Sequence, residues 1–281
     1  MEAMTLKHGL RLVFATVVLV GQAFGQTKTY IALGDSVAWG YQPNDVNRDA
    51  GDKGYVRPVA DWIQTQQGGV RPVLFNLGVP GEDSDSFDDT SEIGALLNSN
   101  YPILFRKSQA DTFKAKVASE LSKGHVITHI TYAMGANDLL ELLTDDFLLL
   151  SFEQRKAIAD QALAVARVNV VAQLSLIRQQ CPGATVVVPG YYNPYGAFSG
   201  SPEDRIGKYA IPKLNTILQT ESKRFKARYA TTYTYFVGQE LALTWIGEDD
   251  VHPRDPGYAV IADQVKARFL VPLEWSTGSR P

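Results

Sequence analysis

Short apolar runs alternate along this chain with longer segments in which apolar residues recur every three or four positions. The short runs have the length and the β-branched and aromatic content that are typical of strands. They cover residues 29–33, 73–77, 126–134, 184–188 and 232–237. Strands that alternate with helices form a parallel sheet whose two faces those helices cover. The pattern therefore predicts an α/β protein with a mainly parallel sheet of about five strands.

The ends of the helical segments carry capping signals. Ser151 and Gln154 have the spacing of a capping box, so a long helix is expected to follow Ser151. Asp111 and Thr112 are expected to cap an earlier helix that Gly124 ends. Further helices are expected around residues 55–66, across residues 214–225 and from about residue 255. One helix therefore falls between each pair of successive strands, and one follows the last.

The N-terminal segment has a different pattern from the rest of the chain. Lys7 and Arg11 precede an uncharged apolar run over residues 12–20. Ala23 and Gly25 then stand at the −3 and −1 positions of a cleavage site. The run is too short to span a bilayer, which takes about 20 residues. These features predict a secretory signal peptide, and an uncleaved anchor or a buried helix is the alternative.

The predicted organisation is a signal peptide over residues 1–25 and one domain over residues 26–281, in a secreted or periplasmic protein. The 281 residues are 45% hydrophobic and 20% charged, with a formal net charge of −3, which is ordinary for a soluble globular protein. No basic stripe or basic amphipathic helix is present, so nucleic acid and anionic membrane are not expected partners. Cys181 is the only cysteine, so neither an intrachain disulfide nor a thiolate metal cluster is expected.

Small polar clusters follow three of the predicted strands and precede the last helix. Ser36, Gly78 and Asn137 each lie within four residues of the end of a different strand. Ligands of parallel sheets bind beyond the carboxyl ends of the strands, so these residues are expected to share one rim. Asp249 and His252 stand just before the final helix. Together these residues offer a nucleophile, an amide donor, a base and a carboxylate, which are the parts of a serine acyl-transfer site.

Ser36 is the candidate nucleophile and His252 the candidate general base, because a serine hydroxyl reacts poorly until a base withdraws its proton. Of the other histidines, one leaves with the signal peptide and two open or occupy a strand. Asp249 is expected to accept the second imidazole N–H and to orient the ring, with Asp250 as the neighbouring alternative. No Gly-x-Ser-x-Gly elbow occurs, which disfavours an ordinary α/β-hydrolase. There is also no His-Glu-x-x-His zinc helix and no Walker phosphate loop, and no metal or cofactor is expected.

Three donors are available for the negative charge that develops on an attacked carbonyl oxygen. They are the backbone N–H groups of Ser36 and Gly78 and the side-chain amide of Asn137, each worth about 3–4 kcal/mol in such sites. Gly78 also suits a turn that needs a positive φ. Asp35 and Asp138 are expected to hold their turns through side-chain-to-backbone hydrogen bonds.

Most of the predicted mature region resembles the SGNH family of GDSL-type esterases and lipases. The four blocks of that family fall on residues 33–36, on Gly78, on residues 135–138, and on Asp249 with His252. Val37 stands where the family's name-giving motif has leucine, and the position is apolar either way. The resemblance implies a flavodoxin-like three-layer α/β/α sandwich. It also implies hydrolysis of carboxylic esters through an acyl-enzyme, with the Ser36, Asp249 and His252 roles and the Ser36, Gly78 and Asn137 oxyanion hole given above.

The substrate class stays open between a simple acyl ester, a lipid ester and an acetylated carbohydrate. The leucine-rich residues 139–152 suit an acyl pocket or a lid, and a core helix explains them equally well. Aromatic residues between 191 and 198 suit stacking on a sugar, or simple loop packing. The acidic stretch within residues 82–110 is expected to be a solvated loop rather than a calcium site. A non-catalytic binding module with the same fold is the alternative function.

Overall fold

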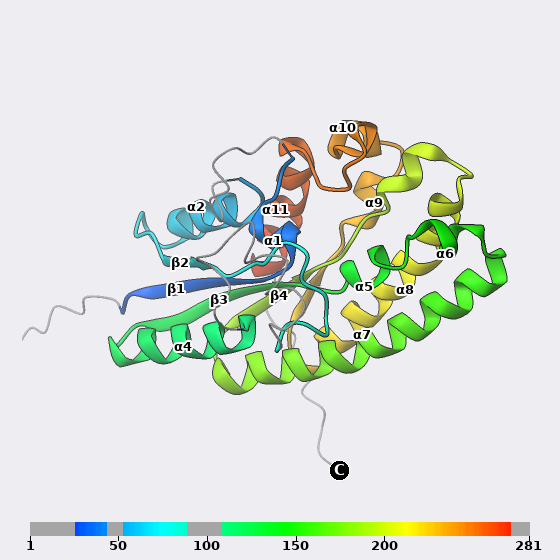
Figure 1. Ribbon diagram of the computed structural model, residues 1–281. Coiled ribbons are helices and arrows are strands. Elements are labelled where there is room, and N and C mark those ends of the chain that lie inside the picture. The colour runs from blue at the N-terminus through cyan, green and yellow to red at the C-terminus, as the bar shows by residue number, and fades with distance from the viewer. Residues whose placement is uncertain (1–25, 44–52, 89–107, 271–281) are drawn as a thin grey trace, which may run out of the picture.

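Five parallel strands form one sheet in the order β2-β1-β3-β4-β5 (Figure 1). The computed structural model describes residues 26–43, 53–88 and 108–270, so the proposed signal peptide lies outside the described residues. The strands are β1 (Lys28–Gly34), β2 (Val73–Asn76), β3 (Val126–Ala133), β4 (Thr185–Pro189) and β5 (Arg228–Ala230). The sheet confirms the predicted fold class.

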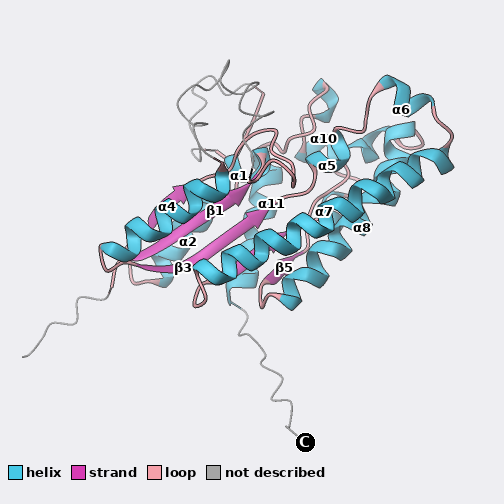
Figure 2. Ribbon diagram, turned by 60° about the horizontal axis from the view of Figure 1, so that its bottom comes forward, coloured by secondary structure: helices cyan, strands magenta, loops and turns pink. Residues whose placement is uncertain are grey.

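Helices cover both faces of this sheet. The longer helices are α2 (Val56–Gln66), α4 (Gln109–Ser122), α7 (Phe152–Gln180), α8 (Pro202–Arg224) and α11 (Asp255–Leu270). In the view of Figure 1, α2 and α11 lie above the sheet, and α4 and α7 lie below it. Helix α11 packs on α2, β4 and β5, while α8 packs on α7, β4 and β5. Figure 2 shows the same strands, in magenta, enclosed between cyan helices.

Short helical turns connect the layers at the carboxyl edge of the sheet. They are α1 (Ser36–Trp39), α5 (Asn137–Leu140), α6 (Asp145–Leu149), η1 (Pro194–Phe198), α9 (Tyr233–Phe236), α10 (Glu240–Leu243) and η2 (Ile246–Glu248). None of the helices within the described ranges is both long and apolar enough to cross a membrane.

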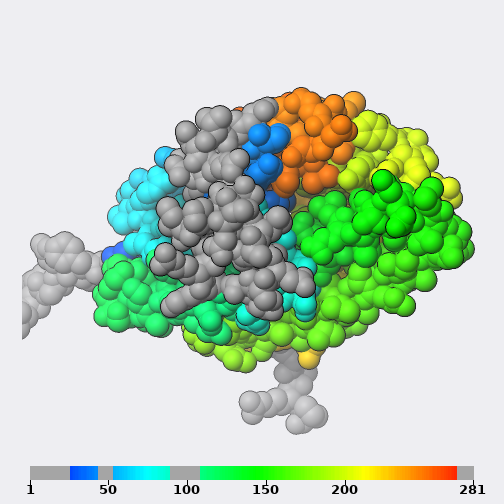
Figure 3. Space-filling model, viewed as in Figure 1, coloured from blue at the N-terminus to red at the C-terminus, as the bar shows by residue number. Residues whose placement is uncertain are grey.

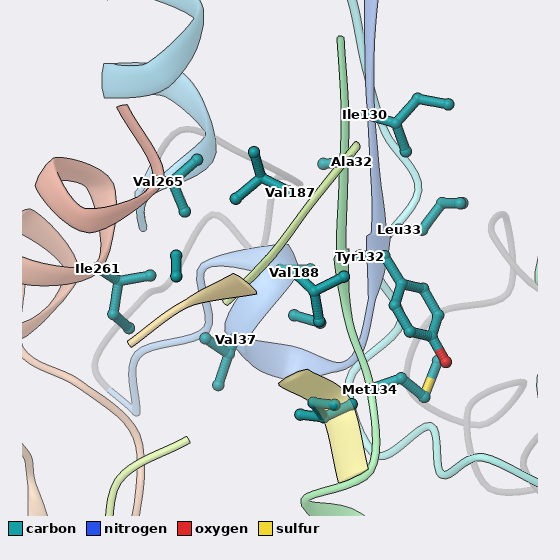
Figure 4. Close-up of a cluster of buried hydrophobic side chains, with 14 of the residues drawn as sticks. Ala32, Leu33, Val37, Ile130, Tyr132, Met134, Val187, Val188, Ile261 and Val265 are labelled. Carbon is teal, nitrogen blue, oxygen red and sulfur yellow. The ribbon is translucent and has the colours of Figure 1, made fainter. Parts of the chain in front are cut away.

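The core lies on both faces of the sheet, because successive side chains of a strand point to opposite sides. Figure 4 shows one layer in which Leu33, Ile130 and Tyr132 point away from α11. On the other side of the sheet, Val187 points toward Ile261 and Val265 of α11. All six of these residues are buried. This two-sided burial explains why the central strands are nearly continuous apolar runs in the sequence.

The fifth predicted strand, residues 232–237, is wrong. The edge strand is the three-residue β5, and Tyr233–Phe236 forms the short helix α9 instead. The Thr232 hydroxyl donates to the carbonyl of Gly190 at 2.6 Å, just beyond the end of β4, and the chain turns there. Phe236 then stacks on Tyr192 at 4.1 Å between ring centroids. The aromatic content that suggested a strand therefore packs a loop.

Two helix starts were predicted from capping residues, with different outcomes. The capping box of Ser151 and Gln154 is present at the start of α7, as predicted. Helix α4 instead begins at Gln109, and Ser108 is its N-cap, accepting from the N–H of Asp111 at 3.1 Å. The start predicted at Asp111 and Thr112 is therefore wrong. Asp111 lies in the first turn, where its charge is favourable to the helix dipole.

Candidate active site

Ser36 is the first residue of α1 and follows directly on the end of β1. Asp35 caps this turn: one of its carboxylate oxygens accepts from Val37 N–H at 2.8 Å. Its other oxygen accepts from the Tyr191 hydroxyl at 2.6 Å. Asp35 therefore holds its turn as predicted, and it ties the Ser36 turn to the loop that follows β4.

The imidazole of His252 lies between Ser36 and an aspartate. Its Nε2 is 2.8 Å from the Ser36 Oγ, and its Nδ1 is 2.7 Å from Oδ1 of Asp250. The carboxylate that contacts the ring is thus Asp250, and the contact expected of Asp249 is wrong. The structure brings residues 216 positions apart in the sequence into hydrogen-bonding distance.

The local backbone decides which aspartate reaches the ring. Asp249 ends η2 in the left-handed region, with φ 58° and ψ 27°. Asp250 Oδ1 also accepts from the backbone N–H of His252 at 2.8 Å, which makes an Asx turn of the His252 loop. One carboxylate oxygen therefore fixes both the backbone and the side chain of His252.

Other contacts hold the His252 loop in place. The carbonyl of His252 accepts from Trp245 N–H at 2.9 Å, and Thr244 forms an antiparallel bridge with Pro253. The hydroxyl of Tyr192 donates to the carbonyl of Val251 at 2.9 Å. The ring of Tyr41 packs on the imidazole at 4.4 Å between centroids. The histidine therefore sits on a loop that is braced on several sides.

The two aspartates near Ser36 and His252 have shifted pKa values in opposite directions. Burial raises the pKa of Asp35 to about 6, although the Tyr191 and Val37 hydrogen bonds oppose the shift. Burial also tends to raise the pKa of Asp250, but the hydrogen bonds and the charge of His252 outweigh it, so this pKa lies below its ordinary value. Asp250 therefore stays ionised to lower pH than a free aspartate, as a partner of an imidazolium should.

Gly78 lies where only glycine fits. A Cβ there would stand 2.5 Å from the backbone nitrogen of Trp39 and 2.9 Å from the carbonyl carbon of Ala38. Gly78 is not among the glycines with positive φ, so the prediction that its turn needs a positive φ is wrong. Glycine is required at position 78 because the backbone there approaches α1 closely. Its N–H donates to the Asn76 side chain at 3.1 Å. Asn76 in turn donates to the carbonyl of Ala38 at 2.8 Å.

Asn137 is the first residue of α5 and lines the same pocket as Ser36 and His252. One hydrogen of its amide is donated to the carbonyl of Glu82 at 2.7 Å. An amide carries two hydrogens, so a second one is available to a ligand. The next residue, Asp138, accepts from Ser84 N–H at 2.9 Å, and its carboxylate also interacts with its own backbone N–H.

A pocket of about 730 Å³, its open mouth included, adjoins Ser36 and His252. Five apolar side chains from residues 139–152 form one wall: Leu139, Leu140, Leu142, Leu143 and Phe147. Tyr191, Tyr192, Ile206 and Ala210 also line the pocket. Residues around α1 (blue), after β3 (green) and before α11 (orange) come together on the face shown in Figure 3. The leucine-rich segment is thus α5, α6 and their connection, and it lines the pocket.

The acidic stretch is described only in part. Asp83 caps a turn, because its Oδ1 accepts from Asp85 N–H at 2.9 Å and from Ser86 N–H at 2.7 Å. Asp89 and Glu92 lie outside the described residues. Across residues 26–43, 53–88 and 108–270, no group of three or more His, Cys, Asp and Glu side chains could hold a metal ion.

A family model for the GDSL-like lipase/acylhydrolase family matches residues 32–260. The chain belongs to this family. It is accordingly a carboxylic ester hydrolase, and the match spans every site residue discussed above.

Individual proteins are similar to this chain in sequence or in fold. The uncharacterized protein YpmR of Bacillus subtilis (strain 168) is 25% identical over 190 residues, which are 67% of this chain and 72% of YpmR. The lipase Lip_vut3 from a goat rumen metagenome has a TM-score of 0.61 at 22% identity and covers 89% of this chain and 100% of its own. Axe2, an acetylxylan esterase from Geobacillus stearothermophilus, has a TM-score of 0.52 at 15% identity, with 90% and 98% covered. At these identities, the similarity of Lip_vut3 and Axe2 to this chain shows a common fold.

Several residues of this esterase's site have no signal in the sequence. Tyr41, Tyr192 and Glu82 act through long-range contacts, and no sequence pattern indicates those contacts. Asp250 does have a signal, since an aspartate two residues before His252 can form an Asx turn. That spacing favours Asp250 over Asp249.

Proposed function

We propose that this esterase uses Ser36 as nucleophile, His252 as general base and Asp250 as the carboxylate that orients His252. The observation that carries the proposal is the continuous chain of contacts from Ser36 Oγ to His252 Nε2 at 2.8 Å and from Nδ1 to Asp250 at 2.7 Å. A binding module that has lost activity has no need of this alignment. The geometry therefore favours catalysis over binding alone.

In the proposed reaction, His252 Nε2 takes the Ser36 proton as the serine oxygen attacks the ester carbonyl carbon. The tetrahedral intermediate collapses when the imidazolium returns that proton to the departing alcohol oxygen. Ser36 then carries the acyl group. Water, deprotonated by the same nitrogen, attacks the acyl carbon. The imidazolium returns that proton to Ser36 Oγ as the bond between the acyl carbon and the serine oxygen breaks, which releases the acid and free Ser36. The Asp250 carboxylate holds the tautomer and stabilises the imidazolium in both halves.

The proposed oxyanion hole consists of the Ser36 N–H, the second hydrogen of the Asn137 amide and the Gly78 N–H. Ser36 lies in the first turn of α1, where a backbone N–H has no partner within the helix. Asn137 is fixed by its bond to Glu82, so its remaining hydrogen has a defined direction. Gly78 donates to Asn76 in the absence of substrate, and it would have to share or exchange that bond.

We propose an ester with an apolar acyl chain as the substrate class. The wall formed by Leu139, Leu140, Leu142, Leu143 and Phe147 suits a hydrocarbon chain. Among the described residues that line the pocket, none is lysine or arginine. Two aromatic residues that could stack on a sugar are already engaged: Tyr191 donates to Asp35, and the Tyr192 ring is stacked on Phe236. This favours an acyl chain over an acetylated carbohydrate.

Reaction with a fluorophosphonate tests the proposal directly, because only an activated serine is phosphonylated. The wild type should label once per chain and lose esterase activity in proportion. Ser36→Ala should not label, and Asn137→Ala should label more slowly while its kcat falls by roughly 10²–10³. Near-normal ester hydrolysis by folded Ser36→Ala would overturn the assignment.

A further inference from the structure

A buried side-chain bridge joins the end of β1 to the loop that holds Asn137. Gln109, the first residue of α4, binds both backbone groups of Gly34: its Oε1 accepts from Gly34 N–H at 2.7 Å, and its Nε2 donates to the Gly34 carbonyl at 2.9 Å. The same Nε2 donates to the carboxyl group of Glu82. The backbone carbonyl of Glu82 accepts from the Asn137 amide at 2.7 Å.

Gln109 takes the place of a neighbouring strand at this point of the sheet. Strand β2 ends at Asn76, and only Val79 N–H still reaches the Gly34 carbonyl, at 2.9 Å. The side-chain amide of Gln109 therefore pairs with Gly34 as a peptide unit would. Gly34 is followed by Asp35 and Ser36, so this pairing fixes the turn that presents the nucleophile.

Burial makes the bridge rigid and chemically unusual. Glu82 is 3% exposed and Gln109 is 4% exposed. Burial raises the pKa of Glu82 to about 9, and the charges of Asp83, Asp88 and Asp35 add to the shift, whereas the Gln109 hydrogen bond opposes it. The charged or titratable groups that face Glu82 are thus Asp83 and Asp88 of its own loop, Asp35 after β1 and Tyr132 of β3. The raised pKa favours a neutral carboxylic acid at Glu82.

We propose that Gln109 and Glu82 are positioning residues that set the Asn137 amide relative to the Ser36 turn, so that both act on one oxyanion. The inference rests on the proposed function, because it assigns the bridge to the oxyanion hole of the Ser36 reaction. Each link is a direct hydrogen bond, and the path from Gly34 to Asn137 runs through two side chains and one backbone carbonyl. Neither residue touches the reacting atoms.

A double-mutant cycle tests the inference with the 4-nitrophenyl ester of butanoic acid. Gln109→Leu should lower kcat by about tenfold or more with KM changed less than about twofold, because the loss falls on the transition state. In an Asn137→Ala background the same change should lower kcat by less than about twofold, since residues that act through one group are not additive. Equal losses in both backgrounds, or no loss of kcat, would overturn the inference.

Thr29→Val is the matched control. Thr29 is buried in the same strand, and its hydroxyl donates to Glu120 at 3.3 Å at the opposite end of β1. The variant loses a buried hydrogen bond, so it should lower Tm but leave kcat within about twofold. A comparable fall of kcat in Thr29→Val would show that general loosening of β1 explains the Gln109 effect, and would count against positioning.

Glu82 variants decide the question even where Gln109→Leu does not fold. Glu82→Ala should lower kcat as Gln109→Leu does, and the isosteric, neutral Glu82→Gln should restore it to within about twofold of wild type.

The wild-type kcat should also decline above about pH 9 as the buried acid ionises, and Glu82→Gln should lack that decline. No rescue together with an unchanged alkaline limb would overturn the role of Glu82. Fluorophosphonate labelling of Ser36 in the same variants separates the two proposals. If Ser36 still labels but the bridge variants show no loss of kcat, only the positioning role is wrong, whereas absence of labelling in the wild type would overturn the proposed function.

Discussion

One carboxylate oxygen of Asp250 contacts both the backbone N–H and the Nδ1 of His252. The preceding residue, Asp249, has the same charge and lies one position further from the histidine, but its left-handed backbone serves to end η2. Two adjacent aspartates therefore have different roles: Asp250 contacts His252, and Asp249 ends η2. This difference is set by φ and ψ and not by side-chain chemistry.

We predict that Asp250→Asn lowers kcat by roughly 10²–10⁴, because an amide facing Nδ1 no longer favours the productive tautomer or the imidazolium. Asp249→Asn is the matched control, since asparagine tolerates the left-handed conformation and should leave kcat within about threefold. Steady-state kinetics of the two purified variants decide between them. A larger loss of kcat in Asp249→Asn than in Asp250→Asn would instead favour Asp249 as the carboxylate that orients His252.

At the level of single residues, the sequence was informative where chemistry requires a particular residue type. Ser36 and Asn137 follow strand ends and His252 precedes the last helix, and the fold brings all three to one pocket. Asp250 was harder to predict, because Asp-x-His and Asp-x-x-His patterns overlap over residues 249–252. The roles of Glu82 and Gln109 could not be predicted, since their side chains bond to each other across 27 positions of sequence and neither stands in a recognisable motif.

At the level of elements, long periodic segments were predicted better than short ones. The four longer strands and the helices α2, α7 and α11 lie where apolar periodicity placed them. β5 has three residues, too few for a strand pattern, whereas the aromatic run after it resembled a strand and forms α9. The same ambiguity applied to residues 139–152, whose leucines suit a core as well as a pocket.

The pocket walls predict a change in chain-length preference. Ala210 of α8 is buried and lines the pocket, so Ala210→Leu should fill part of the acyl space. We expect kcat/KM for the octanoyl 4-nitrophenyl ester to fall by about tenfold or more, and that for the acetyl ester to change less than about threefold, because one buried methylene is worth about 0.8 kcal/mol. Ala210→Ser, which adds a single heavy atom, is the control. Equal effects on both esters would indicate general damage and not a shorter pocket.

At the scale of the whole molecule, the order of the strands converts sequence distance into proximity. β1 lies between β2 and β3, so the turns that follow these three strands meet at one edge. The loop before α11 reaches the same edge, held by the Thr244 bridge to Pro253. Four segments of the chain thus supply one site, and the fold itself supplies their geometry.

We propose that the protein is exported, with cleavage after Gly25. The residues concerned lie outside the described ranges, so the proposal rests on the basic, apolar and small-residue pattern of the first 25 residues. N-terminal sequencing of the protein isolated from its native host should begin at or near Gln26. Recovery of the full-length chain from the cytoplasm alone would contradict export.

The buried acid Glu82 also predicts how the stability of the whole molecule depends on pH. Its pKa is about 9 in the folded protein, whereas an unfolded chain has the ordinary value of 4.5. Between these values the folded state holds a proton that the unfolded state has released. The free energy of unfolding should therefore decrease as pH rises, by about 1.4 kcal/mol per pH unit for this one group.

The range from about pH 7 to pH 8 separates this contribution from the other shifted groups. The folded and ordinary pKa values of Asp35 (about 6 and 3.8) and of His129 (about 4 and 6.5) all lie below this range, and those of Cys181 (about 12 and 9.0) lie above it. Urea unfolding at several pH values should show the slope in the wild type. Glu82→Gln cannot ionise, so its profile should be flatter by about one proton and its stability relative to wild type should grow with pH. Parallel profiles for the two proteins would show that Glu82 does not remain protonated in the fold.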